Sequence, residues 1–355
     1  MLKPDITVAI CTHDNAEMLD RALRQLARQR VTSGTWELLV IANRCSDRTS
    51  ELLRAWEASR AFSSMRAVCE ERLGLSNARR AAIHHARADL IAFIDDDCFL
   101  DTGWIDAAVR FGRGEPRAGA FGGRVSIRWE TPPTDLGAAC EWILARQELG
   151  PEPVKLPPVG GVPLVGAGIV IRRAAIAHSG WIERGHFMGR VGKALTSGDD
   201  AEMSFRIRSA GWDLWYTPTM KLDHVLGAWR SELRYLARLH YAVGLTLPHI
   251  WILAGTCRRT PFSSLFLLAK GLARGLRRAL SALTYRVRGN ELKAQQRWLD
   301  ARLHFGCARG AFALPPAAPE PAQPASSDRL PEREASPRAA RSEPLSRATF
   351  LIRGR

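Results

Sequence analysis

The chain has 355 residues, of which 46% are hydrophobic and 25% are charged, and its formal net charge is +15 at pH 7. This composition is typical of a globular protein with a substantial core, not of a disordered or fibrous one. The seven cysteines form neither a C-x-x-C pair nor an evenly paired framework. We therefore expect free thiols in a reducing cytoplasm and no zinc site.

Strand and helix patterns alternate through the first half of the chain, as in βαβ units. The expected strands cover residues 6–11, 38–42, 67–69, 90–94, 119–127 and 164–171. The expected helices cover residues 17–28, 47–58, 76–88 and 136–148, and Ser76 is the expected N-cap of the third. This order predicts an α/β fold in which helices flank a mostly parallel central sheet.

The apolar run 91–94 stops abruptly at three consecutive carboxylates, Asp95, Asp96 and Asp97. Four apolar residues in succession suit a strand that is buried on both faces. Three carboxylates at its end repel one another, so we expect a counter-charge there. A divalent cation with oxygen ligands fits, and Mg²⁺ commonly binds together with phosphate. The alternative is a helix N-terminus, although a cap needs one side chain and not three.

Polar clusters follow three of the expected strands, at residues 12–15, 43–47 and 95–97. Each cluster alone is weak evidence, because Asn, Asp and Ser are common in ordinary turns. In an open parallel sheet, however, ligands bind at the carboxyl ends of the strands. One crevice that holds a metal and a nucleotide would use all three clusters.

These motifs resemble those of the family 2 glycosyltransferases, which are inverting enzymes with the Rossmann-like GT-A fold of nucleotide-diphospho-sugar transferases. The resemblance covers residues 5–245 in the family's order, and includes Gly-Leu-Ser-x-Ala-Arg and Asp-x-Asp. The matching segments are 12–15, 41–49, 74–79, 95–97, 166–173 and 199–206. Ala42 stands where the family has an acidic residue, which leaves the identity of the donor base open.

The resemblance implies a role for each polar residue of these segments. Asp95, Asp97 and His224 would bind Mg²⁺ or Mn²⁺, and the metal would stabilise the departing nucleoside diphosphate. Asp200 would be the general base that deprotonates an acceptor hydroxyl and so inverts the anomeric centre. The nucleotide-binding residues would be Thr12, Asp14, Asn43, Asp47, Arg79, Asp95 and Asp96. Two plainer interpretations stay open, namely that Asp199-Asp200 only begins a helix and that His224 is structural.

The positive charge is concentrated in one segment, residues 257–309, which carries 12 basic residues against Glu291 and Asp300. Leucines recur there at helical spacing, a pattern typical of a helix that lies on an anionic membrane surface. The alternative is a helical subdomain packed on the core. The uncharged run 241–257 is shorter than the roughly 20 residues of a spanning helix.

We therefore expect a GT-A catalytic domain over residues 1–245, a basic amphipathic helical region over 246–312 and a disordered Pro/Ala/Arg-rich tail over 313–355. The enzyme would lie in the cytoplasm at the inner face of the membrane. Its acceptor would be a glycan or a lipid-linked sugar, in cell-surface polysaccharide or glycolipid synthesis, and no nucleic acid is expected.

Residues 295–298 miss the Gln-x-x-Arg-Trp spacing of processive synthases by one residue, so transfer of one sugar per encounter is expected. Three alternatives remain. A nucleotidyltransferase of related fold should carry an early glycine-rich loop, which the turn at 12–15 lacks. A nucleic-acid-binding protein would explain the charge, and a non-catalytic family member would explain Ala42.

Overall fold

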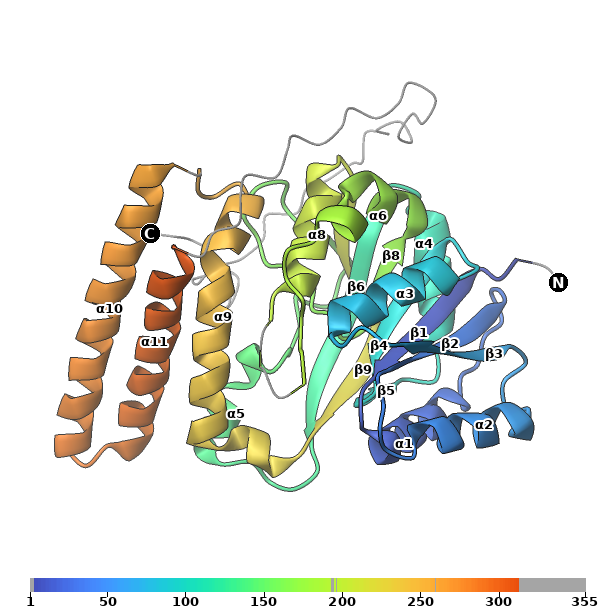
Figure 1. The fold of residues 1–355 in the computed structure, drawn as a ribbon, viewed down its shortest axis with the longest axis horizontal. Helices are drawn as coiled ribbons and strands as arrows, with labels where there is room; N and C mark the ends of the chain where they lie inside the picture. Colours follow the sequence, from blue (N-terminus) through green and yellow to red (C-terminus); the bar gives the residue numbers. More distant parts are fainter. Residues whose placement is uncertain (1–2, 193–194, 196, 259, 313–355) are drawn as a thin grey trace.

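The computed structural model describes residues 3–192, 195, 197–258 and 260–312, so the expected tail at 313–355 lies outside the described residues. A nine-stranded sheet forms the centre, helices cover both of its faces, and three long C-terminal helices form a layer at one side (Figure 1). The expected α/β class with a mostly parallel sheet is confirmed.

The first half of the chain builds four parallel strands in the order β3-β2-β1-β4. The strands are β1 (Ile6–Thr12), β2 (Trp36–Asn43), β3 (Met65–Glu70) and β4 (Leu90–Asp95). The helices between them are α1 (Ala16–Leu26), α2 (Thr49–Ser59) and α3 (Leu75–His85). Helices lie over both faces, so β1, β2 and β4 are buried nearly throughout, as expected for parallel strands. Their carboxyl ends meet at one edge.

The second half of the chain extends this sheet in the order β4-β8-β6-β9-β5, with β7 paired to β9. The strands are β5 (Cys98–Leu100), β6 (Ala118–Trp129), β7 (Val154–Lys155), β8 (Ile169–Arg172) and β9 (Asp213–Leu226). The helices are α4 (Trp104–Gly114), α5 (Asp135–Ala139), α6 (Arg173–Ser179), α7 (Trp181–Arg184) and α8 (Asp199–Ser209). Strand β8 is antiparallel to both of its neighbours, whereas β6 and β9 are parallel to each other.

The helix expected over residues 136–148 is wrong, because only α5 and the 3₁₀ turn Glu141–Ile143 form there. Gln147 instead pairs with Val125 of β6 through two backbone hydrogen bonds. Its side-chain amide donates to Gly123 O (2.8 Å) and accepts from Val165 N–H (3.1 Å). These tertiary bonds hold the segment in an extended form that an isolated helical pattern does not reveal.

Two smaller expectations are also wrong. Helix α3 begins at Leu75 with Gly74 at the N-cap, so Ser76 lies inside the helix and its hydroxyl donates to Phe187 O (2.7 Å). The expected strand at 164–171 begins only at Ile169, because Gly168 adopts a left-handed backbone conformation with φ of 79°.

The C-terminal layer consists of α9 (Leu233–Leu253), α10 (Pro261–Val287) and α11 (Glu291–Gly310), with α11 between the other two (Figure 1). The expected domain boundary at residue 245 falls inside α9. Among the described residues, no helix is long and apolar enough to span a bilayer.

Helices α9 and α11 approach each other closely at glycines. A Cβ added to Gly244 would lie 2.1 Å from the backbone oxygen of Leu303, and one added to Gly306 would lie 2.3 Å from that of Tyr241. Glycine at both positions therefore lets the two backbones come into contact.

We predict that Gly244→Ala lowers the free energy of unfolding by about 1–3 kcal/mol, because overpacking displaces a backbone and not a flexible side chain. Urea denaturation measures the change. Gly114→Ala is the matched control, because a Cβ there meets nothing within 4 Å. If both variants are as stable as the wild type, the close contact between α9 and α11 does not exist in solution.

Candidate active site

A cleft of about 460 Å³ opens at the carboxyl ends of β1, β2 and β4. It is also lined by residues of α3 and α8 and by the end of β9. Most residues expected at the site line this cleft: Thr12, Asp14, Asn43, Arg79, Asp95, Asp96, Asp97, Asp200 and His224. Asp47 does not line it. The topology thus brings together side chains that lie up to two hundred residues apart in the sequence.

Asp97 lies beside an arginine and a histidine in the cleft. Its Oδ2 accepts a hydrogen bond from Arg230 Nη2 (3.0 Å) and lies 3.3 Å from His224 Nε2. Burial alone would raise the pKa of Asp97, but His224 and Arg230 hold it well below its usual value. Asp97 is therefore ionised at neutral pH.

His224 is oriented by the backbone. Its Nδ1 lies 3.0 Å from Leu144 O, and because a carbonyl oxygen only accepts, Nδ1 must carry the proton. Nε2 is then directed toward Asp97. Metal-ligating histidines typically have this arrangement, with the second ring nitrogen bound to a backbone carbonyl or carboxylate.

The donor set fits a divalent cation that prefers oxygen. Oxygens of Asp95 and Asp97 lie within 4.8 Å of each other and of the Cys98 sulfur. Burial raises the pKa of the Cys98 thiol well above its usual value, so this sulfur stays protonated and is a poor ligand. The two carboxylates remain, with His224 beside Asp97, and these ligands suit Mg²⁺ or Mn²⁺ better than a thiophilic metal.

Asp96 faces the turn between β1 and α1. It accepts hydrogen bonds from Thr12 Oγ1 (2.6 Å) and Asn15 Nδ2 (2.9 Å). Burial and the charge of Asp97 raise the pKa of Asp96 to about 7. Asp95, by contrast, lies 3.9 Å from Arg79 Nη2. The three consecutive carboxylates therefore have three different partners.

Arg79 joins the two acidic parts of the cleft. This arginine of α3 is only 2% exposed, and its Nη1 donates to Asp199 Oδ2 at 2.6 Å. Asp199 therefore positions Arg79 beside Asp95. Gly166 leaves the space for this arrangement, because a Cβ there would lie 2.6 Å from Arg79 Nη2.

Asp200 is held by two backbone amides at the start of α8. Gly166 N–H donates to its Oδ2 and Ala201 N–H donates to its Oδ1, each at 2.8 Å. Burial and the neighbouring charge of Asp199 raise the pKa of Asp200, while Arg79 opposes the shift. An oriented carboxylate with a raised pKa is well suited to accept a proton.

Asn43, which is expected to bind nucleotide, makes hydrogen bonds within the fold. The Asn43 amide donates to Glu70 O (3.0 Å) and Arg72 O (2.9 Å) and accepts from Gly74 N–H (2.8 Å). Asn43 therefore ties the end of β2 to the loop before α3. Its direct contact with a nucleotide stays a prediction.

Asp47 caps two helices. Its Oδ2 accepts from Ala16 N–H (2.9 Å) at the start of α1, and its Oδ1 accepts from Thr49 N–H (3.0 Å) at the start of α2. Asp14, which adopts a left-handed φ of 47°, accepts from Ser46 N–H at 2.6 Å. These bonds shape the rim of the cleft, and the nucleotide-binding roles of both residues also stay predictions.

The cleft is also lined by residues that the sequence-based predictions did not include, and among them are Arg190, Trp229 and Arg230. Arg230 contacts Asp97, and its guanidinium lies 5.3 Å from the centre of the Trp229 ring. A basic residue shortly after His224 was the available signal. It could not be interpreted without β9, the strand that brings residues 224–230 to the cleft.

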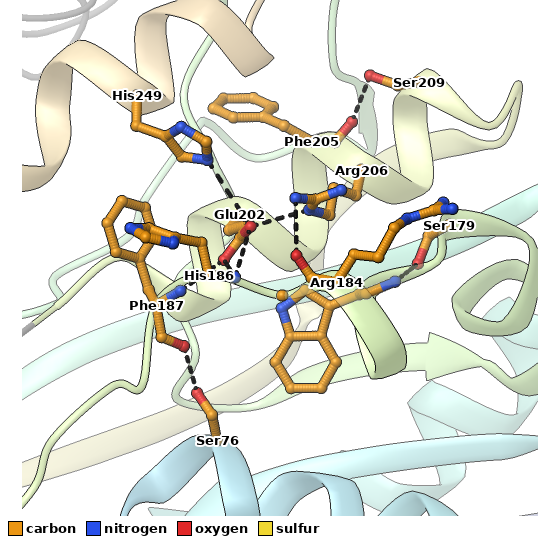
Figure 2. Close-up of polar contacts among 12 residues, drawn as sticks. Ser76, Ser179, Arg184, His186, Phe187, Glu202, Phe205, Arg206, Ser209 and His249 are labelled. Carbon is orange, nitrogen blue, oxygen red and sulfur yellow. Dashed lines mark hydrogen bonds and ion pairs between the residues drawn. The ribbon is translucent and has the colours of Figure 1, made fainter. Parts of the chain in front are cut away.

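A second polar cluster lies beneath the loop that follows α7, centred on Glu202 of α8 (Figure 2). The Glu202 side chain is fully buried and accepts hydrogen bonds from His186 N–H (2.8 Å), Phe187 N–H (2.9 Å) and Arg206 Nε (2.9 Å). Nε2 of His249, from α9, lies 3.7 Å from the same carboxylate. Glu202 thus ties the catalytic-domain helix α8 to this loop and to α9.

This loop also reaches α3, the helix that carries Arg79. The carbonyl oxygen of Met188 accepts from Ser76 N–H (3.1 Å), and that of Arg190 accepts from Leu75 N–H (2.9 Å). Together with the Phe187–Ser76 bond (Figure 2), these contacts bind the loop to the first turn of α3. Glu202 is therefore a positioning residue for one wall of the cleft.

The Glu202 cluster predicts how stability depends on pH. Burial would raise the pKa of Glu202, but His249, the two backbone amides and Arg206 lower it to about 2. Because the folded pKa is below the unfolded one, the stabilisation is present at neutral pH. It is lost as pH falls from about 4.5 toward 2.

We predict that Glu202→Gln lowers the free energy of unfolding by roughly 3 kcal/mol at pH 7. The difference from wild type should shrink by about 2 kcal/mol at pH 3. Urea denaturation at both pH values measures this, with the exposed Glu51→Gln as the control for loss of one charge. If the difference in the free energy of unfolding between the variant and the wild type does not change with pH, the ionised form of Glu202 does not stabilise the fold.

Comparison with known proteins shows a similarity to glycosyltransferases. The model of glycosyl transferase family 2 matches residues 7–158. The glycosyltransferase AglE of Haloferax volcanii is 28% identical over 107 residues, which cover 30% of this chain and 34% of the relative. The match thus spans about a third of that curated relative's length.

The fold resembles that of a solved enzyme, the mannosyltransferase PcManGT of Pyrobaculum calidifontis, determined in complex with GDP-Man and Mn²⁺. The TM-score is 0.50 at 18% identity, and the match covers 86% of this chain and 87% of the other. These comparisons do not favour a nucleotidyltransferase or a nucleic-acid-binding protein. Residues 7–158 therefore match the family 2 glycosyl transferases, and the fold of the chain is similar to that of this mannosyltransferase.

Proposed function

We propose that this chain is a non-processive, inverting glycosyltransferase that transfers a sugar from a nucleotide-diphospho-sugar to a hydroxyl acceptor. The observation that carries the proposal is the presence of two distinct acidic groups in one cleft. Asp95 and Asp97 form a carboxylate pair that suits a cation, and Asp200 is a separate carboxylate on α8. Arg79 lies between them and neutralises part of their charge.

The donor end of the cleft would hold the nucleotide and a cation. Asp95, Asp97 and His224 would bind Mg²⁺ or Mn²⁺, which supplies positive charge to the phosphates of the leaving group. The complex of the similarly folded mannosyltransferase with GDP-Man and Mn²⁺ supports this assignment. Thr12, Asp14 and the carboxylate Asp96 lie on the nucleotide side of the cleft in this proposal.

Asp200 would perform the proton transfer. The acceptor oxygen attacks the anomeric carbon while its proton passes to an Asp200 oxygen. The bond between the anomeric carbon and the phosphate oxygen breaks, and its electron pair leaves on the phosphate. One displacement of this kind inverts the anomeric configuration. The two backbone amides that hold Asp200 fix its orientation for this step.

We predict that Asp200→Asn lowers turnover by roughly two to four orders of magnitude, because the amide cannot accept the acceptor's proton. The affinity for a nucleoside diphosphate should change little, because this residue faces the acceptor. Asp199→Asn is the variant for comparison, because it removes the same charge from the same turn of α8. It should weaken nucleotide binding, because it releases Arg79.

Release of nucleoside diphosphate measures turnover, and calorimetry measures nucleotide affinity. If Asp199→Asn abolishes turnover and Asp200→Asn spares it, the two roles are exchanged. If neither substitution affects turnover, this pair only begins α8 and the base lies elsewhere.

The second part of the proposal concerns the acceptor and the membrane. Helix α10 exposes a continuous apolar stripe to solvent along its length. The stripe consists of Phe262, Leu265, Phe266, Leu272, Leu276, Leu280, Leu283 and Val287. Basic residues of the same helix, including Arg274 and Arg277, adjoin it. Positive charge beside apolar surface complements an anionic lipid surface.

We therefore propose that the enzyme docks on the inner face of the cell membrane through α10. A lipid-linked sugar or a growing glycan at that surface would be its acceptor, in cell-surface polysaccharide or glycolipid synthesis. An exposed apolar face of this length is otherwise unusual for a monomeric protein.

The membrane proposal predicts that the protein sediments with vesicles that contain anionic lipid and is released by high salt. The double substitution Leu276→Glu and Leu280→Glu should weaken binding by roughly tenfold or more, because it places charge in the apolar stripe that would contact the lipid. Val159→Glu, at an exposed loop valine, is the control. Equal binding of all three proteins, or no vesicle binding by the wild type, would assign α10 a purely structural role.

A further inference from the structure

Arg230 is the cation closest to the proposed metal ligands on the β9 side of the cleft. It lies in the short 3₁₀ turn Ala228–Ser231 that follows β9. Ser231 anchors this turn to the loop before α5, because its hydroxyl accepts from Thr134 N–H (3.2 Å) and its carbonyl accepts from Thr134 Oγ1 (2.9 Å). The backbone is thus fixed at a point one residue from Arg230.

The guanidinium of Arg230 binds Oδ2 of Asp97, the Asp97 oxygen that lies beside His224. Its Nη2 lies 3.0 Å from Asp97 Oδ2, the same atom that lies 3.3 Å from His224 Nε2. A cation bound to this oxygen and to His224 would have to replace this contact. A positive group at such a distance also repels a divalent cation. Arg230 and the metal therefore compete for Asp97.

Arginine remains charged at all physiological pH values, so its side chain needs an anion whenever Asp97 is taken. The planar guanidinium is matched to phosphate oxygens, with which it forms paired hydrogen bonds. In the proposed reaction a diphosphate enters the cleft together with the cation. Arg79 is not available to meet it in the same way, because Asp199 holds its Nη1 at 2.6 Å.

We propose that Arg230 is an exchangeable counter-ion, which neutralises Asp97 in the absence of metal and pairs with the donor's diphosphate when cation and nucleotide bind. This inference rests on the proposed function of the cleft. It has two consequences. Binding of the cation and of the nucleoside diphosphate becomes cooperative. The cation takes the place of Arg230 on Asp97, and the freed guanidinium supplies positive charge to the diphosphate. The same guanidinium then stabilises the negative charge on the leaving diphosphate.

The test compares Arg230→Met with Arg234→Met, which removes the same charge from an exposed position in the first turn of α9. Mn²⁺ binding without nucleotide is measured by electron paramagnetic resonance. Binding of UDP and GDP at saturating Mn²⁺ is measured by calorimetry. Thermal unfolding confirms that each variant is folded.

Arg230→Met should bind Mn²⁺ alone several-fold more tightly than the wild type, because a like charge is removed. It should bind the nucleoside diphosphate about 10- to 100-fold more weakly, the usual effect of losing a charged hydrogen bond. Arg230→Lys, which keeps the charge, should recover part of this loss. Arg234→Met should match the wild type in both measurements.

The opposite signs of the two effects are the decisive result. If Arg230→Met weakens Mn²⁺ and nucleotide binding together, Arg230 only supports the shape of the site, and the exchange is refuted. The same holds if both affinities equal those of the wild type. If the wild type itself binds neither UDP nor GDP with Mn²⁺, the proposed function fails first, and the inference fails with it.

Discussion

The whole site depends on how negative charge is neutralised at the carboxyl end of the parallel sheet. Burial raises the cost of every ionised carboxylate there, so each must lie beside a cation or a hydrogen-bond donor. Arg79 neutralises Asp199 and approaches Asp95, whereas Arg230 pairs with Asp97, which also lies beside His224. A divalent cation and a diphosphate would bring opposite charges into this arrangement.

The strands and helices around the cleft hold these charged residues in place. Parallel strands bring their carboxyl ends to one edge, and β9 returns along β6 to deliver His224 and Arg230 to the same edge. Glu202 ties α8 to the loop that covers the start of α3, and α3 carries Arg79. Because His249 of α9 borders the same carboxylate, the C-terminal helices are in contact with one wall of the cleft. A membrane-docked α10 would thus be attached to the catalytic domain through packed helices and not through a flexible linker.

Much of the site could be predicted from the sequence because its signals are local. A buried strand that ends in Asp95 and Asp97 is readable from a few consecutive residues, and so is the acidic start of α8 at Asp200. The rest depends on tertiary contacts. The apolar pattern at 136–148 suggested a helix, but Gln147 pairs with β6. Arg230 could not be predicted as a site residue, because its partner in the cleft, Asp97, lies 133 residues away in the sequence.

The central claim is that the cleft binds a nucleoside diphosphate and a divalent cation as one unit. Calorimetric titration of the wild type with UDP and GDP, in Mn²⁺ and then in EDTA, tests it most directly, with Asp97→Ala as the third arm. The account predicts that one of the two nucleotides binds in Mn²⁺ and that its affinity collapses both in EDTA and in the variant. Equal affinity in all three conditions would contradict the account.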